Sequence, residues 1–259
     1  MQSLRIAATG MHAQQLNVDV LSNNIANLNT TAFKQQNAAF TDLVYQNRIG
    51  VGAITSAAGT LAPTGLQIGL GVSVGSTYKN MTQGSLTNTG NAFDLAVSGR
   101  GFFRVTMPDG TTAYTRDGSF QIDQNGQMVS KEGYAFDPNI TVPANSTDFT
   151  VTANGIVTVK VDKVTTQLGT ITLSMFTNEA GLENMGQNLY RETEASGTAT
   201  DATPAEAGAG TISQNFLESS NVDAIESITR LITAQRAYEL NSRVISTADE
   251  MLQTLSQLR

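Results

Sequence analysis

The segment that decides the fold lies near the C-terminus and reads Leu231-Ile232-Thr233-Ala234-Gln235-Arg236-Ala237-Tyr238-Glu239-Leu240-Asn241-Ser242-Arg243-Val244-Ile245. A first row recurs every seven positions and comprises Leu231, Tyr238, Ile245 and Leu252. A second row follows three positions later, at Ala234, Asn241, Ala248 and Leu255. This heptad spacing predicts a helix with one narrow apolar stripe. Since no Gly or Pro interrupts residues 221–259, the helix should run for about 55 Å, from a capping box formed by Ser220 and Asp223.

The N-terminal residues repeat the pattern. Their first row is Leu4, Met11, Val18 and Ile25, and their second row is Ala7, Gln14, Leu21 and Leu28. Asn27 and Asn29 follow the last apolar positions, and Asn favours caps and turns over helix interiors. We therefore expect this helix to end between residues 27 and 30.

Neither helix can bury its stripe alone. Isolated helices are marginal in water, so each needs a partner, and the other end of the chain is the nearest candidate. Packing of both helices on a central domain is the alternative, and periodicity alone leaves the two open. Length favours pairing, because about 55 Å exceeds the diameter of a domain built from the remaining residues.

The middle of the chain, from about residue 84 to 176, changes to a period of two. Apolar residues alternate at Leu95 and Val97, at Phe103 and Val105, and again around Val157 and Val159. Turn dipeptides punctuate the region at Asp109-Gly110, Asp117-Gly118, Asn125-Gly126, Glu132-Gly133 and Asn154-Gly155. Spacings of seven or eight residues are typical of hairpins, so an antiparallel meander or small barrel is predicted.

These patterns predict an α+β fold. The long N- and C-terminal helices pair as a coiled-coil-like domain, which we assign to residues 1–45 and 211–259, and a central antiparallel β-rich domain of residues 84–194 is inserted between them. Residues 46–83 and 195–210 are rich in small and polar residues and follow neither period. We assign them as a connector and a low-complexity linker.

The amino-acid composition excludes several classes of protein and of binding site. The 259 residues include 15 Lys and Arg, 22 Asp and Glu, one His and no Cys. A disulfide framework, a thiolate site and a multi-histidine zinc site are therefore impossible. The acidic balance, with a pI near 4.7, argues against nucleic acid as a partner. No window reaches the roughly 20 apolar residues of a membrane span, and the first residues do not resemble a signal peptide, so the default location is cytoplasmic.

The sequence gives little support for a catalytic, cofactor or metal site. The glycines between Gly69 and Gly75 have the wrong spacing for a dinucleotide loop, and residues 123–126 lack the ligands that complete a calcium loop. His12 lies beside the first row, where a packing or surface role is favoured. We therefore expect no enzyme activity, catalytic residue, cofactor, metal or small-molecule substrate.

Three separated motifs carry a resemblance that covers nearly the whole chain. They are Ser22-Asn23-Asn24-Ile25-Ala26-Asn27-Leu28-Asn29-Thr30-Thr31-Ala32-Phe33-Lys34, then Asp94-Leu95-Ala96-Val97-Ser98-Gly99-Arg100-Gly101-Phe102-Phe103 with Tyr114-Thr115-Arg116-Asp117-Gly118-Ser119-Phe120, and finally Ser220-Asn221-Val222 with Gln235-Arg236-Ala237-Tyr238-Glu239 and Met251-Leu252. In this order they resemble the bacterial flagellar rod and hook proteins. Ala32 departs from the family, which usually has Gly there. If the position needs a positive φ, Ala costs energy in the bend after the first helix.

Within the family, the length and the segment from Gln46 to Pro63 resemble the distal-rod subunits. A hook protein would be longer, and a proximal rod paralogue is the nearest alternative. A secreted β-rich adhesin or fibre subunit is less consistent with the sequence, because such a protein has no need of matched heptad patterns at both ends.

The resemblance implies a structural subunit that self-assembles into the helical, tubular distal rod. This tube transmits torque from the motor to the hook through the periplasm, and its bore is the export channel. The implied partners are further copies of the chain, proximal rod subunits, hook or hook-junction subunits, the surrounding periplasmic and outer-membrane ring bushings, and the flagellar type III export apparatus, which uses no cleaved signal peptide.

The predicted self-assembly interface combines the first rows with residues of the terminal motifs. It consists of Leu4, Met11, Val18, Asn23, Ile25, Asn27, Asn29, Phe33, Leu231, Gln235, Arg236, Tyr238, Glu239, Ile245 and Leu252. Ninety Asn, Gln, Ser and Thr residues stand against 37 charged ones. Neutral polar groups can be covered at lower cost than ions, which suits a subunit surrounded by copies of itself.

Overall fold

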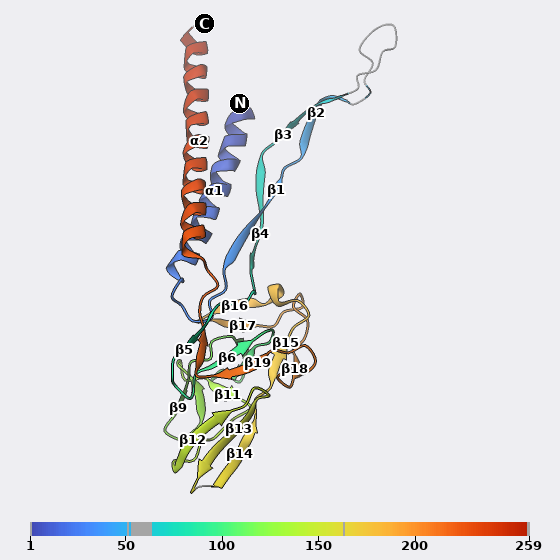
Figure 1. The fold of residues 1–259 in the computed structure, drawn as a ribbon. Helices are drawn as coiled ribbons and strands as arrows, with labels where there is room; N and C mark the ends of the chain where they lie inside the picture. Colours follow the sequence, from blue (N-terminus) through green and yellow to red (C-terminus); the bar gives the residue numbers. More distant parts are fainter. Residues whose placement is uncertain (1, 51, 53–63, 163, 258–259) are drawn as a thin grey trace. The chain divides into compact units, whose positions relative to one another are not determined.

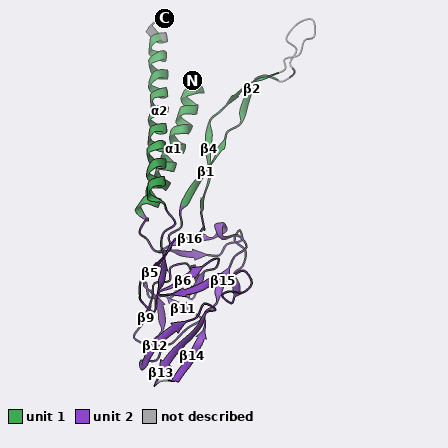
Figure 2. Ribbon diagram, viewed as in Figure 1, with its two compact units in different colours: residues 1–26, 36–79, 223–259 green, residues 27–35, 80–222 purple. Residues whose placement is uncertain are grey.

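The computed structural model describes residues 2–50, 52, 64–162 and 164–257. The chain forms two compact units (Figures 1 and 2). Unit 1 contains Met1–Ala26, Gln36–Lys79 and Asp223–Arg259, and unit 2 contains Asn27–Gln35 and Asn80–Val222. An N-terminal helix, an antiparallel β-rich middle and a C-terminal helix confirm the α+β class.

Two helices, α1 (Gln2–Ala26) and α2 (Ala224–Gln257), lie side by side in unit 1 (Figure 1). The first ends at Ala26, one residue before the predicted range of 27–30. The capping prediction is wrong by three residues. Asp223 Oδ1 accepts the Glu226 N–H at 2.9 Å and caps α2, whereas the Ser220 hydroxyl accepts the N–H of Val222 outside the helix. Within the described residues, neither helix is long and apolar enough to cross a membrane.

A long β-hairpin completes unit 1. Its strands β1 (Gln36–Asp42) and β4 (Val72–Lys79) pair antiparallel, as do β2 (Tyr45–Ile49) and β3 (Leu66–Gly69). Residues 46–83 were predicted as a connector that follows neither period, but they contain three strands of this hairpin. Residues 36–45 lie in the same unit as the helices, as assigned, whereas residues 27–35 belong to unit 2. The hydrogen bonds of a β-ladder join backbone groups and do not depend on the side chains. Because exposed and half-buried residues occur on both faces of this hairpin, its sequence lacks the apolar–polar alternation that predicts a strand. Residues 51 and 53–63, in the segment from Gln46 to Pro63, lie outside the described residues.

Gly71 lies where this hairpin packs against α1. Its φ is +119°, and a Cβ at this position would overlap Thr9 Oγ1 and approach Thr9 Cβ to 3.3 Å. The same hydroxyl donates to the Ile6 carbonyl and accepts the N–H of Val72. The glycines between Gly69 and Gly75 thus lie in and between two strands, where Gly71 allows close packing against a helix.

Unit 2 is built on a seven-stranded antiparallel sheet with the order β16-β17-β8-β7-β11-β10-β9. The strands are β7 (Phe103–Thr106), β8 (Thr112–Thr115), β9 (Phe120–Ile122), β10 (Met128–Ser130), β11 (Ala135–Asp137), β16 (Glu183–Gly186) and β17 (Leu189–Arg191). The predicted turns at Asp109-Gly110, Asn125-Gly126 and Glu132-Gly133 connect hairpins, and each Gly has a positive φ. Buried Phe103, Phe120 and Phe136 pack ring against ring in the core.

Asp117-Gly118 is not a hairpin turn. β8 pairs with β7 and β17, and β9 pairs with β10. A Cβ on Gly118 would overlap the Leu95 carbonyl, and the Leu95 N–H donates to the Gly118 carbonyl at 3.0 Å. Glycine is needed here for close backbone approach, a role that the dipeptide alone cannot distinguish from a turn.

The remaining strands of unit 2 form smaller sheets. β12 (Ser146–Val151), β13 (Ile156–Val161) and β14 (Val164–Thr170) make one, and the predicted Asn154-Gly155 turn connects its first two strands. Three pairs join β5 (Leu86–Asn88) to β20 (Phe216–Glu218), β6 (Leu95–Ser98) to β19 (Thr211–Gln214), and β15 (Leu173–Met175) to β18 (Thr200–Ala202). A 3₁₀ turn, η1, covers Glu179–Gly181.

Two more predictions are wrong in this region. Residues 195–210 are not a linker, since they contain β18 and the fully buried Ser196. Residues 211–218 belong to strands of unit 2 and not to the helical domain. Small residues that resembled a linker supply tight turns, with positive φ at Gly197 and Gly208.

Replacing Gly71 with Ala should weaken the docking of the hairpin on α1. The new Cβ meets both an unfavourable φ and the Thr9 side chain, so the free energy of local opening should fall by about 2–4 kcal/mol. Hydrogen exchange of the β4 amides measures this loss. Gly110→Ala is the control, because Gly110 has φ +80° and no neighbour within 4 Å of the added Cβ. An equal loss in both variants would show that contact with Thr9 adds nothing.

Candidate functional site

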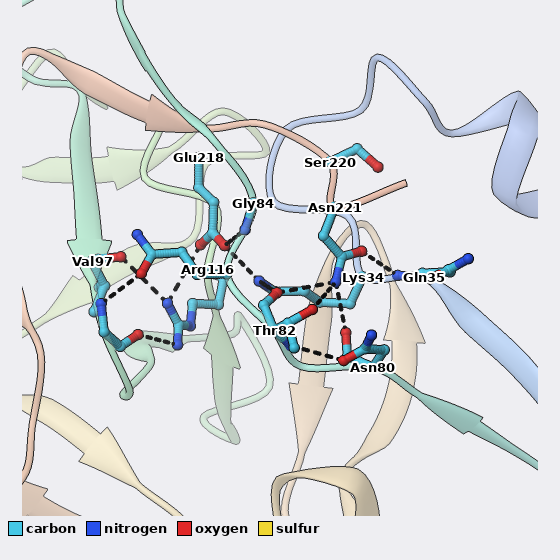
Figure 3. Close-up of polar contacts among 12 residues, drawn as sticks. Lys34, Gln35, Asn80, Thr82, Gly84, Val97, Arg116, Glu218, Ser220 and Asn221 are labelled. Carbon is cyan, nitrogen blue, oxygen red and sulfur yellow. Dashed lines mark hydrogen bonds and ion pairs between the residues drawn. The ribbon is translucent and has the colours of Figure 1, made fainter. Parts of the chain in front are cut away.

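A buried cluster of three charged side chains lies in unit 2 (Figure 3). Lys34 follows α1 in sequence, Arg116 follows β8, and Glu218 ends β20. The Lys34 Nζ donates to Glu218 Oε1, and Arg116 Nη1 lies 3.4 Å from Glu218 Oε2. All three side chains are at most 2 % exposed. One carboxylate therefore serves two cations out of contact with water.

Backbone groups complete the cluster. The Gly84 N–H donates to Glu218 Oε1 at 2.9 Å, and Lys34 Nζ donates to the Thr82 carbonyl at 2.9 Å. Arg116 Nη2 donates to the Gly99 carbonyl at 2.6 Å, and its guanidinium lies 5.3 Å from the centre of the Phe102 ring. The Thr82 carbonyl thus faces Lys34, whereas the Gly99 carbonyl and the Phe102 ring face Arg116, and together they help to stabilise two positive charges that share one carboxylate.

Burial sets the electrostatics of the cluster. It lowers the pKa of the Lys34 ammonium and of the Arg116 guanidinium, and the adjacent Glu218 carboxylate opposes both shifts. Removing the carboxylate would leave two buried cations without an anion. A buried ion whose partner is lost costs far more than an exposed one.

The sequence prediction missed this cluster. All three residues lie in or beside the quoted motifs, but Phe33 and the neighbouring asparagines were selected instead. The sequence did offer one signal, because charged residues are rare in this chain. Lys34 follows Phe33, and Glu218 follows Leu217, in stretches that are otherwise neutral. Pairing of residues 184 positions apart cannot be deduced from one sequence.

The second feature is the helix pair of unit 1. Four second-row residues are buried, Ala7 and Leu21 on α1 and Ala234 and Ala248 on α2. Gly10 also lies at the contact, where an added Cβ would be 2.9 Å from Asn241 Nδ2. Small side chains here let the helices approach closely.

First-row residues flank this contact and remain partly accessible. Those that are half-buried are Leu4, Met11, Val18, Ile25, Leu231, Ile245 and Leu252. Tyr238 is 41 % exposed. Four predicted residues, Val18, Gln235, Tyr238 and Glu239, come together with Gln15 around a hollow of about 430 Å³. The hollow has the size of a few side chains and is open to the surface.

The other predicted residues are placed differently. Asn23, Asn29 and Arg236 are exposed, and Asn27 is half-buried and accepts the Thr30 hydroxyl at its side chain. Phe33 is 8 % exposed and lies within unit 2. As an assembly interface, the predicted set stays a prediction.

A further apolar face runs along α2. Six large side chains are exposed there, namely Ile225, Ile228, Ile232, Leu240, Val244 and Met251, with Ile225 at 80 % and Leu240 at 61 %. At about 100° per residue, Ile225, Ile228 and Ile232 project about 140–180° from the mean direction of Ala234 and Ala248, whereas Leu240, Val244 and Met251 project about 60–100° from it, on one flank. A surface helix with apolar residues on two sides is expected to have a second partner.

Charge is divided unevenly between the units. Unit 2 has eight Lys and Arg against fifteen Asp and Glu, whereas unit 1 has seven of each. The net charge of −7 therefore belongs to unit 2. Among the described residues, no three His, Asp or Glu side chains gather where they could hold a metal ion.

Comparison with known proteins gives this architecture a family. The flagella basal body rod protein model matches residues 4–34, the flagellar hook protein FlgE/F/G D1 domain model matches 96–159, and the flagellar basal body rod FlgEFG protein C-terminal model matches 213–258. The chain belongs to the flagellar basal-body rod protein family.

Full-length relatives carry the name flagellar basal-body rod protein FlgG. The Caulobacter vibrioides protein is 53 % identical, with 100 % of each chain covered. FlgG of Buchnera aphidicola subsp. Acyrthosiphon pisum is 48 % identical over 99 % of each chain, and that of Borreliella burgdorferi is 44 % identical, covering 100 % of this chain and 99 % of its own.

Replacing Glu218 with Gln should lower the free energy of unfolding of unit 2 by about 3–5 kcal/mol, because Lys34 and Arg116 lose their shared anion in a buried site. Urea denaturation followed by circular dichroism measures the change. The matched control is Glu183→Gln, which removes an exposed pair with Arg191 and should cost at most about 1 kcal/mol. Similar losses in the two variants would contradict the role of burial.

Proposed function

We propose that this protein is a structural, non-enzymatic subunit of the flagellar distal rod, which polymerises into a helical tube. The observation that carries the proposal is the second apolar face of α2, considered together with full-length relatives named as rod proteins. A helix that already packs on α1 through small residues, yet presents Ile232, Leu240 and Val244 outward, is suited to contact a neighbouring copy.

The helix pair supports a coiled-coil-like assembly that neighbours complete. First-row residues are half-buried in the single chain, so each can bury more apolar surface on assembly. The hollow beside Tyr238 is open to receive side chains. A head-to-tail contact of this type does not close on itself and generates a helical polymer.

Charge supports the same arrangement. Unit 1 has no net charge, so copies of it can be packed together without mutual repulsion, whereas the acidic unit 2 would repel its neighbours if it were equally crowded. We therefore assign unit 1 to the wall of the tube and unit 2 to its outside.

The proposed tube passes torque from the motor to the hook through the periplasm, and its bore serves as the export channel. Its partners are proximal rod subunits, hook or hook-junction subunits, the ring bushings around the rod and the type III export apparatus. Family membership and the printed names of the relatives support this placement.

Deletion of residues 222–259 should leave a soluble monomer that cannot polymerise, because α2 supplies both helix contacts. Electron microscopy of concentrated protein tests this. The full chain should form straight tubes, curved tubes would indicate a hook-type subunit, and robust filaments from the truncated chain would refute the proposal.

Single substitutions separate assembly from folding. Leu240→Gln should change the free energy of unfolding of the monomer by at most about 0.5 kcal/mol, since the side chain is exposed. It should raise the critical concentration for tube formation about 10- to 100-fold, because a leucine buried on assembly contributes about 1.5–3 kcal/mol. Val164→Gln, at a 65 % exposed position on β14, is the control and should leave assembly unchanged. An unchanged critical concentration in Leu240→Gln would count against the α2 face.

A further inference from the structure

The covalent chain passes between the two units at four points. They follow Ala26, Gln35, Lys79 and Val222. Along the covalent chain, a force applied to unit 1 reaches unit 2 at these four passages. Residues on the unit 2 side of the passages are therefore the first to be loaded.

Three of these passages are tied together by one side chain. Asn221 Oδ1 accepts the Gln35 N–H at 2.7 Å, and Asn221 Nδ2 donates to the carbonyls of Asn80 at 2.9 Å and Thr82 at 3.0 Å (Figure 3). The Asn80 N–H also donates to the Gln35 carbonyl at 2.8 Å. One amide thus holds the segments that lead into β1, out of β4 and into α2.

The segment after α1 is joined to the segment before α2 by the backbone as well. The Ala32 N–H donates to the Glu218 carbonyl at 2.7 Å, and the Asn221 N–H donates to the Phe33 carbonyl at 3.3 Å. Lys34 and Glu218 add their buried ion pair between the same two segments. The two segments are therefore fastened by main chain, amide and charge over four residues each.

The backbone conformation of Ala32 shows that contacts between the two segments outweigh the conformational preference of a single residue. Its φ of +56° is unusual for a residue with a Cβ, yet its N–H is held by Glu218 and its side chain is 1 % exposed. The predicted cost of Ala in the bend is therefore present. Surrounding contacts stabilise the bend against it.

We propose that residues 32–35, 80–84 and 218–221 form a force-bearing clasp, which carries load from one terminal segment to the other and so shields the β-sheets of unit 2. The biological need for it rests on the proposed torque-transmitting function. Without the clasp, tension on residues 27–35 and 218–222 would peel β20 from β5 and then β19 from β6. With it, the load crosses between Lys34 and Glu218 without entering those pairs.

Single-molecule force measurements on the full-length monomer test the clasp, and the absence of native Cys allows unique attachment sites. Handles on Asn29→Cys and Ile225→Cys load the clasp, and handles on Thr112→Cys and Ala153→Cys load the sheets without crossing it. Asn221→Ala, which removes the side-chain hydrogen bonds to Gln35, Asn80 and Thr82, should shorten the lifetime at fixed force about 10- to 100-fold with the first handles. With the second handles the lifetime should change less than about threefold.

Asn178→Ala is the matched control, because its amide donates to the Ala195 carbonyl away from the passages. It should alter neither lifetime by more than about threefold. Equal shortening with both handle pairs would show that Asn221 only stabilises the fold, and no shortening with the first pair would show that the clasp bears no load. Either result overturns the proposal. Tube formation is scored separately, so failure of the rod assignment and failure of the clasp remain distinguishable.

Discussion

The structure of unit 2 depends on the Glu218 carboxylate. Its single negative charge is shared by two buried cations, which come from positions 184 and 102 residues away. Apolar burial is non-directional and tolerates shifts of one element past another. A buried ion pair tolerates none, because any arrangement that separates Lys34 from Glu218 leaves an uncompensated charge. We infer that the cluster selects one register among those that the apolar core alone would allow.

Unit 1 is organised by the opposite principle. Its helices meet through Ala7, Gly10, Ala234 and Ala248, which give close approach but little buried area for each residue. Larger apolar side chains are left half-buried or exposed on α2. The two units therefore differ in kind, because unit 2 is stabilised by a buried core and a buried ion cluster, whereas unit 1 leaves large apolar side chains accessible.

Sequence reasoning worked where one local pattern determines one structure. Heptad spacing over Leu231 to Leu252 predicted α2, and dipeptides such as Asn125-Gly126 predicted hairpins because a positive φ is a local demand. It failed at Asp117-Gly118, where glycine serves a close approach to Leu95 that is visible only in three dimensions. It also failed for the long hairpin and for residues 195–210, because polar ladders and tight turns share the composition of linkers. The candidate sites divide in the same way. Heptad spacing selected Val18 and Tyr238, which line one hollow and whose role in assembly stays a prediction, whereas the pairing of Lys34, Arg116 and Glu218 is long-range and has no local signal.

The sparse charge of the chain is explained by where the charge lies. Only 37 residues are charged, and unit 1 balances its seven positive against seven negative side chains. Burying an unpaired ion costs several kcal/mol, whereas a neutral amide or hydroxyl can exchange water for a neighbouring carbonyl at little net cost. A surface rich in Asn, Gln, Ser and Thr can therefore be covered by copies of itself in a dense polymer, provided that apolar groups such as Ile232 and Leu240 supply the driving force. Unit 2 carries the net charge of −7, so covering it with copies of itself would bring like charges together. The division of charge along one chain therefore makes unit 1 the less costly of the two units to bury in such a polymer.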